Sequence, residues 1–389
     1  MAQTSAQPTE VSGLIIYTDD TNAYSHDGVY YSLSEAQADG INVLNANCWA
    51  VVAHYHVSEF FRLNPAGSLW VKICEYNAAY PEIEQMQTAS GNTIRQFGIH
   101  NPIEFSTTEI DLVQAQLTVL REQFRPAVAL LSFGKLLPTG VTLSTLPDLM
   151  TGTTPNAPSV SVVAWTYRDA PPNILTQPIC ARYLYGTLLP AASVVNPELP
   201  NVGATLGALS RRAIHEHHGW VQVGNLDVGS LEREPTISDT TPNPSQALLF
   251  AIHAKGYTFA RRFPDFGGSY LCDDFTCTAS ESDYNNLRNN RVINEAVRGV
   301  YKALLPYVNS PIVLQPDGKL SPGTKATFES TASTPLANMQ AQGNISAYQV
   351  IVPATQNVLT TNKIQVQVRI IPVGGAKYIE VSLGFVAQI

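Results

Sequence analysis

From residue 47 to residue 165 the hydrophobic positions change repeatedly between a helical and an extended pattern. Apolar residues at helical spacing predict helices over 49–63, 82–89 and 107–124, and short apolar runs between them predict strands. The run Ala127–Phe133 is apolar at nearly every position, which is typical of a strand covered on both faces of a parallel sheet. This part of the chain is therefore predicted to be an α/β unit.

The following two hundred residues combine helices with longer connections. Two helices are expected within 183–218, and the turn-forming residues of 229–246 and 318–343 predict loops. The strongest helical pattern covers Asp283–Leu305, and Pro306 stops it. One face of this helix is an apolar stripe that is expected to be buried in the subunit: Ile293, Ala296, Val297, Val300, Tyr301 and Leu304.

The C-terminal tail alternates apolar and polar residues, which predicts β-strands over 348–352, 364–370 and 379–385. Gly374-Gly375 indicates a hairpin between the last two strands. The final strand runs nearly to Ile389, and no helix or charge cluster follows to cover it. A long alternating strand at a terminus is a template for pairing with another chain, although pairing inside its own domain explains the same pattern.

Composition narrows the possible functions of the 389 residues. Charged residues make up 14%, against about 25% in an average domain, and the net charge is −8 with basic residues scattered along the chain. This argues against a nucleic-acid groove and against binding to an anionic membrane surface. A surface poor in charge suits a subunit packed against copies of itself, and an Asn/Thr-rich free surface is the alternative.

The sequence shows no clear signal for export, membrane insertion or disulfide bonding. The N-terminus lacks the basic and apolar regions of a signal peptide, and no apolar run approaches the ~18 residues of a membrane-spanning helix. The chain has five cysteines, an odd number, with no pairing pattern. Reduced thiols in a cytosolic environment are therefore expected.

The histidine cluster His215-Glu216-His217-His218 is the first candidate for chemistry. A zinc-protease helix places histidines at positions i and i+4, and position 219 is glycine here. His215 and His218 have a spacing of three and could chelate a metal. A polar helix end that Gly219 terminates explains the same residues more simply.

Two further patterns have structural alternatives. An acidic cluster that could bind a divalent cation comprises Asp273, Asp274, Glu281 and Asp283. Solvation of a loop and capping of the following helix explain these residues as well. The nearby Cys272 and Cys277 lack the second cysteine pair that a zinc module usually needs. Gly203 and Gly207 have the small-xxx-small spacing of a closely packed helix. No phosphate-binding loop or nucleophile elbow is present, so no catalytic residue and no cofactor is predicted.

Four motifs in the second half resemble the contractile tail sheath proteins of phages: Gly256–Arg262, Gly267–Asp274, Ser282–Tyr284 and Asn290–Ile293. In that family an aromatic strand leads to a Gly-Tyr acidic loop and then to a long helix. The final two predicted strands are similar to the closing β-hairpin of sheath subunits. The match is closest to the shorter, divergent branch of the family and covers roughly residues 200–389.

The resemblance implies an α+β or α/β fold, with mixed-sheet α/β sandwich core domains and terminal β-strand arms that pair with neighbouring subunits. It implies a flexible N-terminal arm over 1–12 and an α/β domain over 13–200. It also implies a C-terminal sheath domain over 201–389 that contains the long helix 283–305 and a closing hairpin over 363–386.

The implied function is that of a structural subunit without enzymatic activity or cofactor. The subunit would polymerise around an inner tail tube and contract by repacking, in a virion tail or injection-system particle assembled in the bacterial cytoplasm. Its partners would be copies of itself, the tube protein, and baseplate and tail terminator proteins, with no nucleic acid and no membrane insertion. The residues expected to pair between subunits are Leu14, Ile15, Ile16, Ile379, Val381, Leu383 and Phe385, and those expected to face the tube are Arg288, Arg298 and Lys302.

Two alternatives remain open from the sequence. One is a metal-dependent hydrolase built on His215, His217 and His218 with the Asp273-Asp274 loop. The other is a different virion structural protein, such as a capsid or baseplate component, which would share the low charge and the lack of a catalytic motif.

Overall fold

The computed structural model describes residues 10–18, 24–45, 47–138, 140–167, 200–229, 235–237 and 244–375. The chain forms two compact units, Met1–Lys302 and Ala303–Ile389, here called unit 1 and unit 2. The domain boundary predicted at residue 200 is wrong, because the helix that follows it is buried in the core of unit 1.

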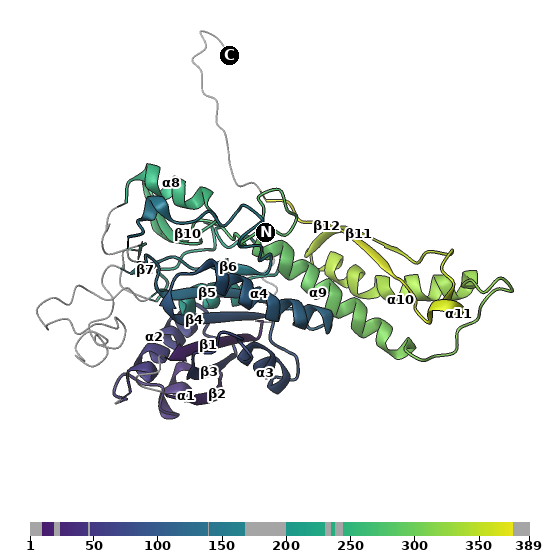
Figure 1. Ribbon diagram of the computed structural model, residues 1–389, viewed down its shortest axis with the longest axis horizontal. Helices are drawn as coiled ribbons and strands as arrows, with labels where there is room; N and C mark the ends of the chain where they lie inside the picture. The colour runs from purple at the N-terminus through teal and green to yellow at the C-terminus, as the bar shows by residue number, and fades with distance from the viewer. Residues whose placement is uncertain are drawn as a thin grey trace, which may run out of the picture. The chain divides into compact units, whose positions relative to one another are not determined.

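Unit 1 contains a six-stranded sheet with the strand order β2-β3-β1-β4-β5-β6 (Figure 1). Its strands are β1 (Ser12–Thr18), β2 (His26–Tyr30), β3 (Leu69–Glu75), β4 (Gln96–Glu104), β5 (Val128–Lys135) and β6 (Val160–Val162). Every pair in this sheet is parallel except β2 with β3. The prediction of a mixed α/β fold is confirmed.

The longer helices of the first half were predictable from their apolar spacing. They are α2 (Cys48–Leu63), α3 (Glu82–Ala89) and α4 (Thr107–Glu122), whereas the short helix α1 (Leu33–Ala38) was not predicted. The Asn47 side chain caps α2 by accepting the Trp49 N–H, which satisfies one of the free donors of the first turn. Cys48 is disulfide-bonded, so the prediction of five reduced cysteines is wrong at that position; Cys74, Cys272 and Cys277 are free thiols.

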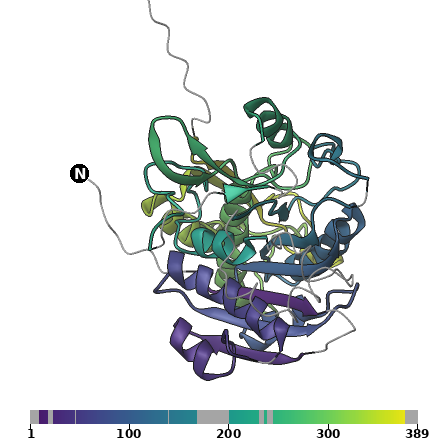
Figure 2. The same ribbon diagram turned by 90° about the vertical axis from the view of Figure 1, so that its left-hand side faces the viewer.

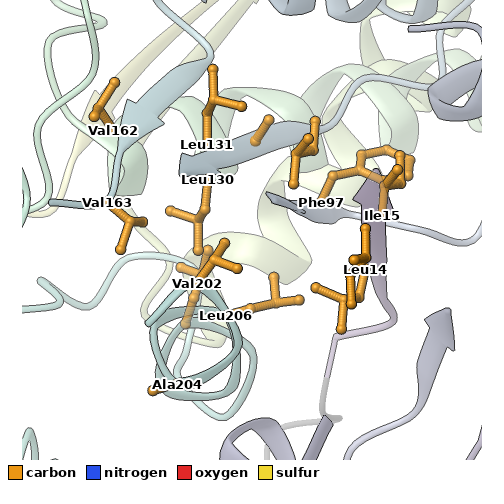
Figure 3. Packing of buried hydrophobic residues seen from close by; sticks show 14 of the residues in the cluster. Leu14, Ile15, Phe97, Leu130, Leu131, Val162, Val163, Val202, Ala204 and Leu206 are labelled. Carbon is orange, nitrogen blue, oxygen red and sulfur yellow. The ribbon is translucent and has the colours of Figure 1, made fainter. Parts of the chain in front are cut away.

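Helix α7 (Val202–Ser210) is buried at every position. Val202 and Leu206 meet Leu14 on one face of the sheet, around Gly98 of β4 (Figure 3). On its other side, a Cβ at Gly203 would collide with the His56 carbonyl oxygen of α2. The predicted close packing at Gly203 and Gly207 is thereby confirmed.

The other described parts of unit 1 contain short strands and two more helices. These elements are the 3-10 turn η1 (Leu143–Thr145), β7 (Thr166–Tyr167), β8 (Pro235–Thr236), α8 (Gln246–Ala254), β9 (Ala260–Phe263), β10 (Phe266–Leu271) and α9 (Leu287–Leu304). Strands β9 and β10 pair as an antiparallel hairpin, and β7 and β8 also pair antiparallel. The predicted long helix is confirmed as α9, which starts four residues later than expected and extends into unit 2.

The described part of unit 2 contains η2 (Leu305–Tyr307), α10 (Pro322–Ala341), β11 (Ile345–Ile351), α11 (Val358–Thr361) and β12 (Gln367–Pro372). The loop predicted over 318–343 is wrong, since α10 fills most of it. Ser321 caps this helix and Pro322 occupies its first turn, which are both helix-start signals. The buried residues Phe328, Ala332, Leu336 and Met339 share one helical face.

Two buried histidines face each other in unit 1, between α2 and the sheet. The rings of His56 and His100 lie 5.2 Å apart, and His100 Nδ1 is 3.2 Å from the Ser132 hydroxyl. Neither nitrogen of His56 has a hydrogen-bond partner. Burial lowers the pKa of His100 to about 4, and burial beside His100 lowers the pKa of His56 well below its ordinary value. Both rings are therefore neutral in the folded protein.

We expect the folded state to lose stability as the pH falls from about 6.5 towards about 4. In this window the histidines of the unfolded chain become protonated, whereas the buried rings of the folded chain stay neutral. His100 alone should lower the free energy of unfolding by about 2 kcal/mol at pH 5. Urea unfolding at pH 7 and pH 5 measures the effect. His100→Phe should flatten this dependence, and an unchanged slope in the variant would contradict the assignment.

Candidate functional site

The sheet of unit 2 has features expected of an assembly site. Strands β11 and β12 pair only with each other among the described residues, and most of their side chains are half-buried or exposed. The Ile371 side chain is 61% exposed. The buried cluster below is small and comprises Leu320, Phe328 and Val352. A two-stranded sheet of this kind is only marginally stable by itself.

The predicted inter-subunit strands divide into two groups. Ile379, Val381, Leu383 and Phe385 lie outside the described residues, so their pairing remains a prediction. The prediction for Leu14–Ile16 is wrong, because β1 pairs with β3 on one side and with β4 on the other. A strand with both edges occupied cannot pair with a neighbouring subunit.

The arm predicted over residues 1–12 is shorter than expected. Ser12 already belongs to β1, and the Glu10 carboxylate lies 2.8 Å from Arg291 Nη2 of α9. The Arg291 side chain is buried and also donates to the carbonyls of Arg212 and Ala213. Residues 10–12 are therefore part of the folded unit, and an arm can comprise only residues 1–9.

Two of the three residues predicted to face a tube, Arg288 and Arg298, have side-chain contacts within unit 1. Arg298 donates hydrogen bonds to the carbonyls of Asn92, Ile94 and Pro126, and burial lowers its pKa to about 9. Arg288 is mostly buried beside Asp274. Internal carbonyls bind the Arg298 guanidinium and the Arg288 Nε lies 4.0 Å from Asp274 Oδ2, whereas Lys302 is exposed, so the tube-facing assignment of all three residues remains a prediction.

The buried side of α9 is also different from the predicted stripe. Its buried residues are Leu287, Asn290, Arg291, Val292, Asn294 and Ala296, whereas Ile293, Val297 and Val300 are half-buried and Tyr301 is 36% exposed. Polar groups can occupy the buried side because they have partners. The Asn290 amide, for example, donates to the carbonyls of Tyr284 and Asn286.

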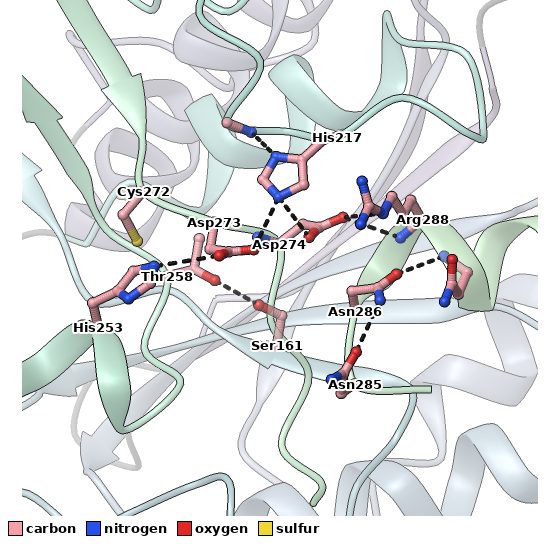
Figure 4. A network of polar contacts seen from close by, with 12 residues as sticks. Ser161, His217, His253, Thr258, Cys272, Asp273, Asp274, Asn285, Asn286 and Arg288 are labelled. Atoms are coloured by element: carbon pink, nitrogen blue, oxygen red, sulfur yellow. Dashed lines mark hydrogen bonds and ion pairs between the residues drawn. The ribbon is translucent and has the colours of Figure 1, made fainter. Parts of the chain in front are cut away.

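A buried polar network joins the predicted histidine and acidic segments (Figure 4). His217 Nε2 lies 3.0 Å from Asp273 Oδ1 and 3.2 Å from Asp274 Oδ1, and His253 Nε2 lies 3.3 Å from Asp273 Oδ2. Asp274 is fully buried and accepts the Arg288 N–H at the start of α9. Its negative charge is favourable at this helix N-terminus.

The network brings potential ligand atoms of His217, Asp273 and Asp274 within 4.8 Å of one another, and the hydrogen bonds of His217 show how the ring is held there. The Gly219 N–H donates to His217 Nδ1 at 2.9 Å, so the proton of the neutral ring is on Nε2 and points at the carboxylates. A metal on Nε2 would require the loss of that proton, which would leave an imidazolate. The ring is instead oriented to donate a hydrogen bond to Asp273 Oδ1, and Asp274 Oδ1 lies 3.2 Å from the same nitrogen.

The other residues of the predicted metal cluster do not join it. Within the described ranges, His217, Asp273 and Asp274 are the group whose potential ligand atoms lie together, and His215 and His218 are not part of it. Burial and the nearby Arg291 and Arg212 lower the pKa of His218 well below its ordinary value. Burial raises the pKa of the Cys272 thiol to about 12, so it is neutral at physiological pH. The network therefore anchors the loop before α9.

The described residues contain no helix that is both long and apolar enough to cross a bilayer.

Three solved assemblies align with nearly the whole chain. The contracted helical sheath of the anti-feeding prophage (AFP) gives a TM-score of 0.63 at 16% identity, covering 98% of this chain and 94% of that chain. A chain of the AFP baseplate gives 0.62 at 16% identity with the same coverage. The contracted sheath complex of PVC, an extracellular contractile injection system, gives 0.60 at 12% identity, covering 99% and 96%. The sheath-like fold expected from the sequence is confirmed.

Sequence comparison gives the family. The model described as DUF2586, N-terminal domain, matches residues 18–275, and the model described as DUF2586, C-terminal domain, matches residues 283–389. No curated protein matches the chain significantly. Because the two models together cover most of its length, the chain belongs to the DUF2586 family.

Proposed function

We propose that this chain is the structural, non-enzymatic subunit of a contractile sheath. Copies assemble helically around an inner tube, and their repacking during contraction drives the tube through a target envelope. The observation that carries this proposal is the end-to-end correspondence in fold with the contracted AFP sheath. Electron microscopy of the concentrated protein tests it: hollow tubes or stacked rings are expected, and a monomer under all salt conditions would count against it.

Strand exchange is the proposed link between subunits. Among the described residues the β11–β12 sheet has two strands, and the sequence that follows it carries alternating apolar residues at positions 379–385. Such a tail from one copy can extend the sheet of another by backbone hydrogen bonds, with its apolar side chains on one face. Residues 1–9 are a second candidate arm. A heterologous link of this kind, repeated without closure, generates a helical polymer.

The proposed polymer belongs to a phage-tail-like particle. The similarity to a chain of the AFP baseplate supports an additional contact between the sheath and a baseplate. We propose on grounds of charge that the tube contact involves unit 2 together with Lys302, the last residue of unit 1. Residues 303–389 contain five basic and three acidic residues, a net charge of +2, so residues 1–302 carry −10. A weakly basic surface complements an acidic tube.

Charge reversal of exposed cations should weaken the attachment of the tube. We expect Lys302→Glu combined with Lys363→Glu to reduce co-sedimentation of the sheath with its tube protein, because both changes remove basic charge from exposed positions. Sheath-only polymers should form as in the wild type. Undiminished co-sedimentation would remove these two residues from the tube interface.

A further inference from the structure

Helix α8 is an apolar helix that the described part of unit 1 leaves largely uncovered. Seven of its nine residues are apolar and none is Asp, Glu, Lys or Arg, yet only Ile252 is buried. The Phe250 side chain is 62% exposed, and Leu248 and Leu249 are half-buried. A helix that is apolar on most of its circumference is normally enclosed by protein. The composition of α8 therefore indicates an additional contact surface.

A second apolar surface lies beside α1. Tyr31 is 64% exposed and Leu44 is 88% exposed. The backbone presenting them is well ordered by hydrogen bonds. The Tyr31 N–H donates to Glu35, the Leu44 N–H donates to the Asn42 side chain, and the Asn45 amide donates to the Gly40 carbonyl. The two apolar side chains are thus held outward by a fixed loop.

The two surfaces lie at opposite ends of unit 1. Helix α8 is at the top of this unit and α1 with β2 is at the bottom, and the view turned by 90° keeps the same arrangement (Figures 1 and 2). They are also complementary in charge. Residues 24–45 with the paired Lys72 carry a net charge of −2, from Asp27, Glu35 and Asp39 against Lys72. Residues 244–265 carry a net charge of +2, from Lys255, Arg261 and Arg262 against Asp265.

We infer that the α8 end of one copy docks on the α1 end of the next copy, with Phe250 packed against Tyr31 and Leu44. One chain cannot bring its own opposite ends together, whereas a second copy satisfies both surfaces at once. The contact is heterologous and leaves the same two ends free on the outer copies, so it propagates. This inference rests on the proposed sheath function and adds to it a contact between the cores, separate from strand exchange in unit 2.

Photo-crosslinking tests the contact in the assembled full-length protein. We replace Phe250 with p-benzoylphenylalanine, mix isotope-labelled and unlabelled subunits, irradiate the polymer and identify the crosslinked peptides by mass spectrometry. The expected products join position 250 to residues 31–44 of a differently labelled copy. Crosslinks confined to the same chain, or to other regions of a second copy, would overturn the inference.

Point variants provide the second measurement. Phe250→Asp and Leu44→Asp should each raise the protein concentration needed for polymerisation by about tenfold or more, because each buries a charge in an apolar contact. Val119→Asp is the control, since Val119 is also exposed but lies on α4. Wild-type polymers together with normal growth of both variants would contradict this contact and leave the sheath function intact. Failure of the wild type to polymerise would instead contradict the sheath function.

Discussion

Removal of residues 376–389 is expected to leave a folded subunit that no longer grows into tubes. The described residues that form the buried clusters of both units all lie before 376, and we expect these cores to survive the deletion. The deletion should instead weaken the association between subunits. A donated strand stabilises that association by ~1 kcal/mol net for each backbone hydrogen bond and by ~1.5–3 kcal/mol for each buried side chain. The sum is on the order of 10 kcal/mol before ordering costs.

Sedimentation and thermal melting of the same samples measure assembly and folding separately. A matched pair sharpens the test, since neighbouring residues of a strand point to opposite faces. Leu383→Asp should prevent polymerisation, whereas Ser382→Asp should have a much smaller effect. If the deletion unfolds the monomer, the strand belongs to its own domain and the strand-exchange proposal loses its support.

The second large effect is expected at the contact between α7 and α2. Gly203→Val should destabilise unit 1 by at least about 3 kcal/mol, because the added side chain would overlap the His56 backbone. Gly207→Ala should be milder, as its Cβ would lie 2.6 Å from the Phe60 carbonyl oxygen. Neither helix can yield easily, since both pack against other parts of the core.

Urea unfolding followed by tryptophan fluorescence measures both changes. Gly323→Ala is the control, because Gly323 is also a helical glycine and a Cβ added there would meet nothing within 4 Å. It should be neutral or stabilising by up to about 1 kcal/mol. Wild-type stability of the Gly203→Val variant would contradict the described packing.

Much of unit 1 was predictable because its elements carry strong local signals. Strand β5 lies in the centre of the sheet and is therefore apolar at nearly every position. Helices α2 and α4 bury residues against the core, and this produces the helical spacing of their apolar residues. The Gly203 and Gly207 pair was predictable for a similar reason, since small residues one turn apart have a single common use in a helix.

The errors occur where distant partners decide the environment. The sequence of α9 could not show that Arg291 pairs with Glu10. It also could not show that Arg298 donates hydrogen bonds to the carbonyls of residues 92, 94 and 126. The strand Leu14–Ile16 looked short and terminal, and its central place depends on β3 and β4. Helix α10 was missed because its many Ser and Thr residues and Pro335 hid a one-sided apolar spacing.

The most direct test of the account is a helical reconstruction by cryo-electron microscopy of polymers grown from the purified full-length chain. Strand exchange predicts a hollow tube in which residues 376–389 of one copy lie as a strand against the β11–β12 sheet of a neighbour. Particles that remain monomeric at every concentration, or tubes in which this segment pairs only within its own chain, would contradict it.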